Sequence, residues 1–201
     1  FPSFKGRMEL VKVPYLRRYS DECDIYRPLI NERTVGRHVA PHALELASLW
    51  AVLTRMRRND PKLYSKEIGD VIEDLSPMDK LLLYDRADVP PQISARLSKE
   101  LRHVIPDLYE ETIRFPNYEG RFGASAREIR TSLLNASHHE DYECLSPFAV
   151  LDELESLLES KSVYDFLKQD VVGKYHDHQG FLEQTRSLFV DWIDDEVRQA
   201  M

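Results

Sequence analysis

Apolar residues recur at helical spacing along most of the chain, and this pattern predicts a mainly α-helical protein. In residues 40–58, a helix start is expected at Pro41, and a wide apolar face follows that consists of Leu44, Ala47, Trp50 or Ala51, and Leu53 or Thr54. Residues 94–115 should form a helix that is interrupted at Pro106, because proline removes a helical hydrogen bond. Further helices are predicted over residues 20–28, 59–75, 76–91, 126–139, 146–160, 162–170 and 177–201, with Ser20, Ser76 and Asp177 as N-caps.

One segment, "MELVKVPYL" (residues 8–16), has the pattern of a β-strand. Its apolar positions suggest burial on both faces, as in an α/β sheet. A single strand leaves its backbone hydrogen-bonding groups unpaired, so it needs a sheet that this chain does not supply. The expected fold is therefore mainly α, with a multi-helix lid and a helical C-terminal domain after one residual N-terminal strand. We expect the chain to be the C-terminal part of a larger protein.

The segment "GRFGASAREIR" (residues 120–130) contains a clear helix start. Ser125 and Glu128 have the spacing of a capping box, so a helix should begin at Ala126. This start places Arg127 in the first turn, where the helix dipole disfavours a cation by about 0.3–1 kcal/mol. The unfavourable position raises the question of what Arg127 does there.

The helical pattern of residues 126–139 also fixes the direction in which Arg127 projects. At 100° per residue, Ile129, Leu133 and Ala136 lie on one side of the helix, and Arg127 lies on the other. Arg127 is therefore expected to project away from the buried face. It is either an ordinary surface residue or an arginine directed at a phosphate, to which a guanidinium group can bind with two donors.

Composition and charge limit the classes of partner. The 201 residues include 10 Tyr and 8 Phe, too many aromatic residues for a disordered chain. The net charge of −8 argues against nucleic acid and against an anionic membrane as partners. No apolar run approaches the ~20 residues that span a bilayer, and no signal peptide is visible. With only Cys23 and Cys144, no disulfide framework is expected, and we expect a cytoplasmic location.

Motifs for chemistry within the chain are few. Two histidine-containing segments, "SHHEDYEC" and "YHDHQG", offer possible zinc ligands but lack the spacings typical of zinc sites. We interpret Asp177 as a helix cap and His138 as part of a helix C-terminus. The acidic residues of "LDELESLLES" are interpreted as a solvated helix face. The chain has no phosphate-binding loop, no nucleophile elbow and none of the protein-kinase motifs, so it is not expected to hydrolyse ATP alone.

A family resemblance covers most of the chain. "GASAREIRTSLLNA" resembles the sensor-2 helix of AAA+ ATPases, and "GRMELVKVPYLRRYSDECDIYRPLI" resembles the last AAA+ core strand and the first lid helix. Together with "GRHVAPHALELASLWAVLTRM", "CLSPFAVLDELESLLE", "SVYDFL", "YHDHQGF" and "DWIDDEVRQAM", these segments are similar to the PrkA family of bacterial serine protein kinases.

The resemblance implies a division of the chain and a nucleotide site. Residues 1–30 would be the end of the AAA+ core strand and the first lid helix, 31–115 a helical insertion, and 116–201 the sensor-2-like helix and a helical tail. Arg127 would bind nucleotide, with Gly123 and Ser125 shaping its turn. ATP and Mg²⁺ would bind in the full-length protein, and neither is expected to bind this part alone. Arg7 is a candidate for an arginine acting on a neighbouring subunit's ATP, although a solvated basic residue is favoured there.

The partners implied are the upstream AAA+ core domain, a protein substrate or regulator, and, in a homo-oligomer, further copies of the same protein. The function implied is closure over ATP, which would couple nucleotide state to protein phosphorylation. Because it lacks the phosphate-binding loop and the protein-kinase motifs, this part is expected to be inactive as an enzyme by itself. The alternative is a non-catalytic helical module that regulates or binds a partner, with Arg127 as a surface residue.

Overall fold

The computed structural model describes residues 11–112 and 118–201. These residues form ten α-helices and two short 3-10 helices and no β-sheet, so the predicted mainly α class is confirmed. No helix within the described ranges is both long enough and apolar enough to cross a membrane. The helices are α2 (Tyr19–Tyr26), α3 (Glu32–Val35), α4 (Ala43–Arg55), α5 (Lys66–Asp74), α6 (Pro77–Arg86), α7 (Ala95–His103), α8 (Ile105–Glu111), α9 (Ala126–Ser137), α10 (Pro147–Glu159) and α11 (His178–Ala200), and the 3-10 helices are Pro61–Leu63 and Asp165–Lys168.

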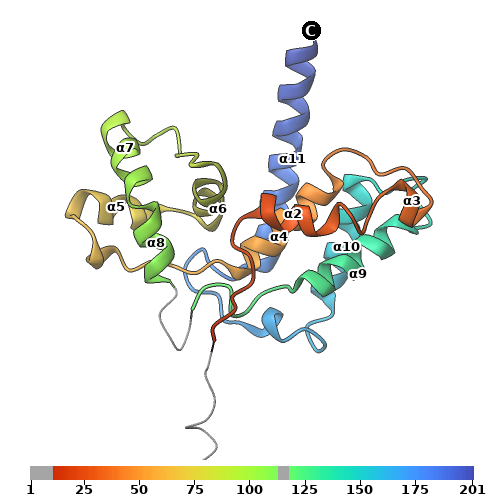
Figure 1. Ribbon diagram of the computed structural model, residues 1–201, viewed down its shortest axis with the longest axis horizontal. Helices are drawn as coiled ribbons and strands as arrows, with labels where there is room; N and C mark the ends of the chain where they lie inside the picture. Colours follow the sequence, from red (N-terminus) through yellow and green to blue (C-terminus); the bar gives the residue numbers. More distant parts are fainter. Residues whose placement is uncertain (1–10, 113–117) are drawn as a thin grey trace, which may run out of the picture.

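Helix α4 is the centre of the fold. Of its 13 residues, all but Glu45 are buried, and Trp50 and Leu53 have no exposed surface. It packs against α2, α9, α10 and α11, which surround it on several sides (Figure 1). A helix that is buried almost all round is a core helix, not the amphipathic surface helix that one apolar stripe would indicate.

Helices α5, α6, α7 and α8 form a second group to one side of α4 (Figure 1). Helix α5 contacts α7, and α7 contacts α8, while α6 contacts both α4 and α2. The group lies within the range expected to be an insertion, 31–115. That range also contains α4, which packs against helices before and after it, and the division of the chain stays a prediction.

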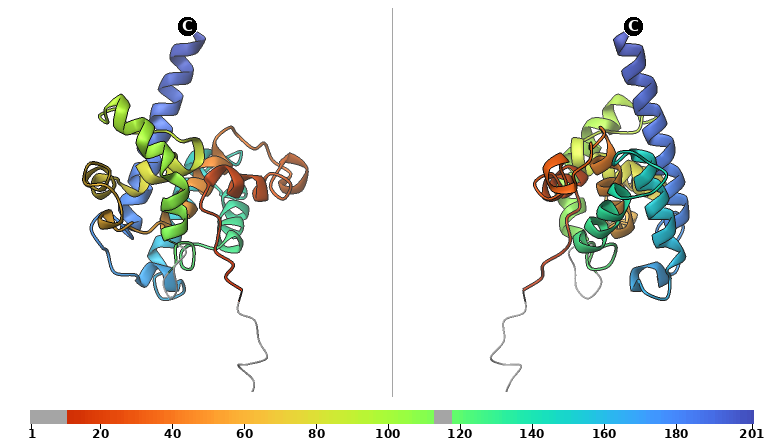
Figure 2. Two further views of the ribbon diagram at one scale, coloured as in Figure 1. Left: turned by 60° about the vertical axis from the view of Figure 1, so that its left-hand side comes forward. Right: turned by 90° about the vertical axis from the view of Figure 1, so that its right-hand side faces the viewer.

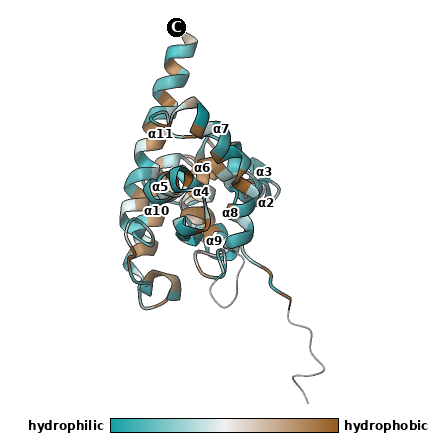
Figure 3. Cartoon of the chain, turned by 90° about the vertical axis from the view of Figure 1, so that its left-hand side faces the viewer, coloured by the Kyte–Doolittle hydropathy of each residue, from teal (hydrophilic) through white to brown (hydrophobic). Residues whose placement is uncertain are grey.

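Helix α11 has two unlike halves. Its first half packs against α4 and α10 and buries Phe181 and Leu182. Its second half lies against His42, at the start of α4, through Trp192 and Glu196, and its last turns extend beyond the other helices (Figures 1 and 2). Apolar turns continue along this part between polar ones (Figure 3), and Val190 and Val197 are 60% and 52% exposed.

The predicted strand is not formed in the part that can be described. Residues 8–10 lie outside the described ranges, and residues 11–16 pair in no β-ladder. Val11 and Val13 are 74% and 79% exposed, so the burial expected on both faces is not seen in this chain. Tyr15 makes a backbone hydrogen bond to a distant segment, since its N–H donates to the carbonyl of Gly120 at 2.8 Å.

The starts of α2 and α4 differ from the sequence predictions. Ser20 does not cap α2, whose N-cap is Arg18; the Ser20 hydroxyl instead donates to the Asp85 carboxylate at 2.7 Å. Helix α4 begins at Ala43 and not at Pro41, because His42 has a left-handed φ of 65° and is the N-cap. The prediction that Pro106 interrupts its helix is confirmed, since α7 ends at His103 and α8 begins at Ile105.

Candidate functional site

The start of α9 is a well-formed helix N-terminus. Helix α9 begins at Ala126, and both halves of the capping box are present. The Ser125 N–H donates to the Glu128 carboxylate at 2.6 Å, and the Glu128 N–H donates to the Ser125 hydroxyl oxygen at 3.3 Å. The prediction of this helix start and of its cap is therefore confirmed.

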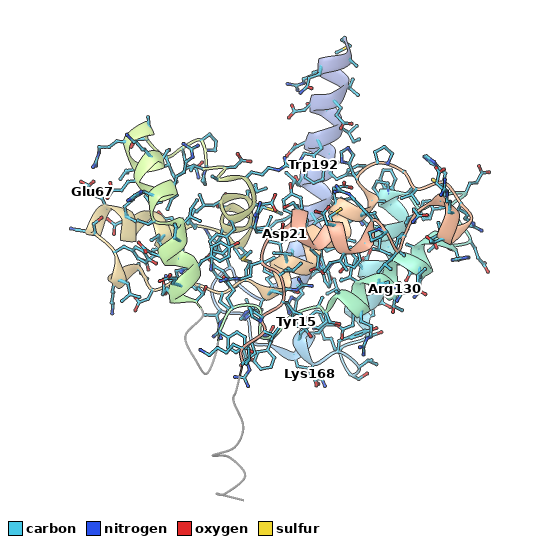
Figure 4. All side chains as sticks on the ribbon, in the orientation of Figure 1. Tyr15, Asp21, Glu67, Arg130, Lys168 and Trp192 are labelled. Carbon is cyan, nitrogen blue, oxygen red and sulfur yellow. The ribbon has the colours of Figure 1, made fainter. Side chains whose placement is uncertain are left out.

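Arg127 is exposed on the first turn of α9. Ile129, Leu133 and Ala136 are all buried on the opposite side, as their spacing predicts. Within residues 11–112 and 118–201, no hydrogen bond, ion pair or ring contact engages the Arg127 guanidinium. Arg130, which Figure 4 labels on the same helix, is also exposed. The structure thus places the cation where a ligand from outside the described chain could reach it.

Gly123 lets the chain pass tightly over the end of α4. Its φ of +128° is a conformation that residues with a side chain rarely adopt. A Cβ atom at this position would lie 2.6 Å from Cγ of Arg55 and 2.9 Å from Oγ1 of Thr54. The next residue is fixed as well, because the Ala124 N–H donates to Oγ1 of Thr54 at 2.8 Å. Gly123 therefore shapes the turn that precedes Arg127.

Arg55 holds this turn in place by hydrogen bonds to its backbone. Its guanidinium donates from Nε and Nη2 to the carbonyl oxygen of Ala124, at 2.9 and 2.7 Å. It also makes a bidentate ion pair with Glu22 of α2, in which both N–O distances are 2.7 Å. A further bond runs from Nη1 to the carbonyl of Leu16 at 3.0 Å, and the Tyr15 ring, labelled in Figure 4, lies 5.1 Å away.

The Arg55–Glu22 pair is almost completely removed from water. The two side chains are 0% and 1% exposed, and Tyr26 donates its hydroxyl to the same carboxylate. Two buried charges are stable together only when their hydrogen-bonding groups are satisfied, and removal of one partner then costs about 3–5 kcal/mol. Because one guanidinium binds α2, the N-terminal segment and the turn before α9, it holds these three parts in one arrangement.

A second buried ion pair holds the other end of the same turn. Nζ of Lys80 lies 2.5 Å from the Glu119 carboxylate and 2.5 Å from the carbonyl oxygen of Arg57. Glu119 also accepts a bond from the Arg57 N–H at 2.7 Å and one from the Thr112 hydroxyl at 3.2 Å. Burial lowers the pKa of Lys80, while the adjacent Glu119 opposes that shift. Through this pair, α6 and the end of α8 are tied to the segment that leads to α9.

Arg17 extends the second network toward α8. Its Nη1 donates to the Tyr109 carbonyl and to the Thr112 hydroxyl, both at 3.1 Å, and lies 3.7 Å from the Glu119 carboxylate. The guanidinium also stacks over the Tyr109 ring at 4.0 Å. Residues 118–124 therefore run between two buried networks, one centred on Glu119 and one on Arg55.

The buried charges were missed by the sequence analysis. No sequence pattern singled out the four charged residues Arg55, Glu22, Lys80 and Glu119. One signal was available for Arg55: it lies four residues after Ala51 and eight after Ala47, so it continues the buried face of α4.

The other predicted site residues have different outcomes. Arg7 lies outside the described residues. His138 is the C-cap of α9, with Nδ1 3.0 Å from the Leu134 carbonyl, and Asp177 caps α11 through the Gly180 N–H. In the part of the chain that the structure describes, no three His, Cys, Asp or Glu side chains are grouped so that they could hold a metal ion.

Comparisons with known proteins give two family matches. The family described as the PrkA AAA domain matches residues 2–62, and the family described as the PrkA serine protein kinase C-terminal domain matches residues 78–201. Arg17, Glu22 and Arg55 lie in the first match, while Lys80, Glu119 and Ala124 lie in the second. Both buried networks therefore join the two matched regions.

One curated protein is also similar along nearly the whole chain. The "ATP-dependent protease PrkA" of Bacillus subtilis (strain 168) is 26% identical over 196 residues, which is 97% of this chain and 26% of that protein. The chain thus spans about a quarter of the length of this relative. No solved structure matches the chain significantly.

Proposed function

The chain belongs to the PrkA family, and from that premise we propose that it closes over an AAA+-type ATP site and carries Arg127 to the nucleotide phosphates. The observation that supports this proposal most is the contrast at the start of α9. The turn before the helix is held by buried hydrogen bonds, while the arginine on the helix is exposed and engaged by no described residue.

The rigidity of the turn matters for the chemistry. A charged donor contributes most to binding and to transition-state stabilisation when its position is fixed before the ligand arrives. In this chain the Arg55–Glu22 pair fixes the Ala124 carbonyl, and the capping box fixes the helix that follows two residues later. Arg127 is therefore presented from a backbone that needs no rearrangement to receive a phosphate.

ATP and Mg²⁺ would be shared between this chain and the upstream core domain. The Arg127 guanidinium fits phosphate oxygens, since it offers several N–H donors in one plane. We assign the phosphate-binding loop and the Mg²⁺-binding acid to the upstream domain, as the family resemblance implies. The role of this chain would be to close over the nucleotide, orient its phosphates and exclude water.

For the reaction coupled to ATP we give a general proposal and a more specific hypothesis. The names of the matching family and of the Bacillus subtilis relative both refer to action on proteins, but one specifies a serine protein kinase and the other an ATP-dependent protease. We propose a nucleotide-dependent action on a protein substrate, with serine phosphorylation as the more specific hypothesis. Because the chain has no protein-kinase motif, phosphoryl transfer would use the AAA+ nucleotide site.

The proposal is tested by replacing Arg127 in the full-length protein. Arg127→Ala should weaken ATP affinity or ATP turnover ten- to a hundredfold, since a charge-assisted bond contributes ~1.5–3 kcal/mol. Arg130→Ala is the matched control, because Arg130 is an exposed arginine on the same helix three residues away. It should leave both quantities within about twofold of the parent.

A second candidate function is a helical module that binds a protein partner or regulates assembly. The exposed apolar residues in the C-terminal half of α11, among them Val190 and Val197, favour it. Equal ATP affinity and turnover in the parent and in Arg127→Ala would contradict the nucleotide proposal and favour this alternative. The hypothesis that Arg7 acts on a neighbouring subunit's ATP is separate; Arg7→Ala should lower turnover and spare ATP binding.

A further inference from the structure

The two buried networks meet at the end of α4. Residues 118–124 cross this end, and hydrogen bonds join them to Thr54, to Arg55 and to Arg57. The Gly120 N–H also donates to the carbonyl oxygen of Arg55 at 3.3 Å. The position of the segment that leads into α9 therefore depends on the position of the end of α4.

The Lys80–Glu119 pair binds both backbone groups of Arg57. Glu119 accepts a hydrogen bond from the Arg57 N–H at 2.7 Å, and Nζ of Lys80 donates to the Arg57 carbonyl oxygen at 2.5 Å. The two charged side chains are 1% and 0% exposed, so no water competes for these bonds. Only one residue separates Arg57 from Arg55, and a displacement of the Arg57 backbone is therefore passed on to Arg55.

Arg55 in turn connects the end of α4 to the start of α9. Its guanidinium donates two hydrogen bonds to the carbonyl oxygen of Ala124, and the next residue, Ser125, is the N-cap of α9. The rest of α9 packs against α4 and α10. A displacement of Ala124 would therefore change mainly the first turn of α9, and this is the turn that carries Arg127.

The other partners of the Glu119 carboxylate lie on or near the group of helices α5–α8. Lys80 belongs to α6, and the Thr112 hydroxyl donates to Glu119 from the end of α8. Arg17 lies 3.7 Å from the same carboxylate and donates to the Tyr109 carbonyl of α8. A displacement of α6 or α8 would therefore reach Arg57, and from there Arg127, through buried polar contacts.

Stability alone gives little reason for an ion pair at this place. Apolar residues of similar volume can often replace a buried pair without loss of stability. Hydrogen bonds between charged groups are, in contrast, short and directional, so they fix the groups that they bind. We propose that Lys80 and Glu119 are positioning residues for Arg127, through which the group α5–α8 takes part in setting the affinity for ATP. This inference rests on the proposed function, because it concerns the same arginine.

The test is a double-mutant cycle in the full-length protein. Lys80→Met and Glu119→Met are introduced together, so that neither charge is left buried without its partner. The dissociation constant of ATP is then measured by calorimetry for the parent, for this double variant, for Arg127→Ala and for the triple variant. A residue that only supports the fold would leave the effect of Arg127→Ala the same in both backgrounds.

In the parent, Arg127→Ala should weaken ATP binding about ten- to a hundredfold. In the double variant the same substitution should weaken it only about two- to threefold, because Arg127 is no longer held at the phosphates. An effect of Arg127→Ala that is as large in the double variant as in the parent would overturn this inference and leave the proposed function intact. The absence of an effect in the parent would contradict the proposed function, and this inference would fail with it.

Thr185→Ala is the control for a general loss of stability. Thr185 is 0% exposed and donates to the Phe181 carbonyl at 2.8 Å within α11, outside both networks. This variant should unfold at a lower temperature and leave the effect of Arg127→Ala unchanged. If it reduces that effect as much as the double variant does, loss of stability explains the result and the inference is overturned.

Glu119→Gln tests the same inference with a smaller change, and it replaces the double variant if that protein does not fold. The glutamine still offers an oxygen to the Arg57 N–H, but it offers no charge to Lys80. It should reduce the effect of Arg127→Ala on ATP affinity about two- to fivefold. An unchanged effect of Arg127→Ala in Glu119→Gln would mean that the charge of Glu119 does not position Arg127.

Discussion

The end of α4 and the start of α9 each carry an arginine, and the two arginines lie on either side of the same turn of chain. At the end of α4, the Arg55 guanidinium is fully buried and bound to a carboxylate and two carbonyl groups. At the start of α9, the Arg127 guanidinium is exposed and is bound by no residue that the structure describes. The first arrangement stabilises a fold, and the second leaves a cation available for a ligand.

This difference shows why residue type alone does not identify a functional site. Arg55 lies at a helix C-terminus, where the dipole favours a cation, and its groups are all used inside the protein. Arg127 lies where the dipole disfavours a cation, so its position is not explained by the stability of its own helix. The following predictions test whether the two residues divide the structural and functional roles in this way.

The largest effect is expected at Arg55. Arg55→Met should lower the free energy of unfolding by about 3–5 kcal/mol, because it leaves Glu22 buried without its partner and frees the Ala124 carbonyl. Denaturant unfolding followed by circular dichroism measures this change. Arg130→Met is the surface control and should change it by less than about 0.5 kcal/mol. A change below about 1 kcal/mol in Arg55→Met would mean that the buried pair does not hold the fold.

Gly123 is expected to show the next largest effect. Gly123→Ala should lower the free energy of unfolding by about 2–4 kcal/mol, because the alanine would combine an unfavourable φ with a collision against Arg55 and Thr54. Gly173→Ala is the comparison, because Gly173 has a positive φ of 62° but no atom within 4 Å of the added Cβ. That variant should cost about 1 kcal/mol from backbone strain alone. Equal losses of unfolding free energy in the two variants would contradict the close approach of the turn to α4.

The acid stability of the chain should depend on His178. Burial holds its pKa at about 4 in the folded chain, below the ordinary 6.5. As the pH falls below about 6.5, the unfolded chain takes up a proton that the folded chain does not, so folding stability decreases until about pH 4. Between pH 7.5 and pH 5 the loss from this residue should be about 1–2 kcal/mol. His178→Gln should remove this part of the pH dependence; an unchanged slope would mean that His178 is not buried as a neutral ring.

The smallest effect on stability is expected at Arg127. Arg127→Ala should change the free energy of unfolding by less than about 0.5 kcal/mol, because no contact of its side chain is lost within the described structure and a charge opposing the dipole is removed. Thermal unfolding of the 201-residue chain is the measurement. A loss above about 2 kcal/mol would show that Arg127 has a structural role, and the contrast with Arg55 would fail.

The sequence predicted local features better than buried polar ones. The capping box of Ser125 and Glu128 was predictable because its two partners lie three residues apart, as was the break at Pro106. The direction of Arg127 followed from the positions of Ile129 and Leu133 on one helix. Each of these features depends on neighbours within one or two helical turns.

The buried networks depend on pairs that are far apart in the sequence. Arg55 meets Glu22 across 33 residues and Ala124 across 69, and Lys80 meets Glu119 across 39. No local pattern distinguishes such charges from solvated ones. Ser20 was misread for a similar reason: its sequence position suits a cap, but Asp85, which binds its hydroxyl, is 65 residues away.

The most direct test of the central claim is a comparison of nucleotides with different numbers of phosphates. ATP, ADP and AMP are titrated into the full-length protein and into its Arg127→Ala variant, and the dissociation constants are measured by calorimetry. If Arg127 contacts the β- or γ-phosphate, the variant should lose ten- to a hundredfold in affinity for ATP and almost none for AMP. The loss for ADP then shows which of the two phosphates is bound. Equal affinities of parent and variant for ATP, or the same loss for all three nucleotides, would contradict the claim that Arg127 binds the terminal phosphates.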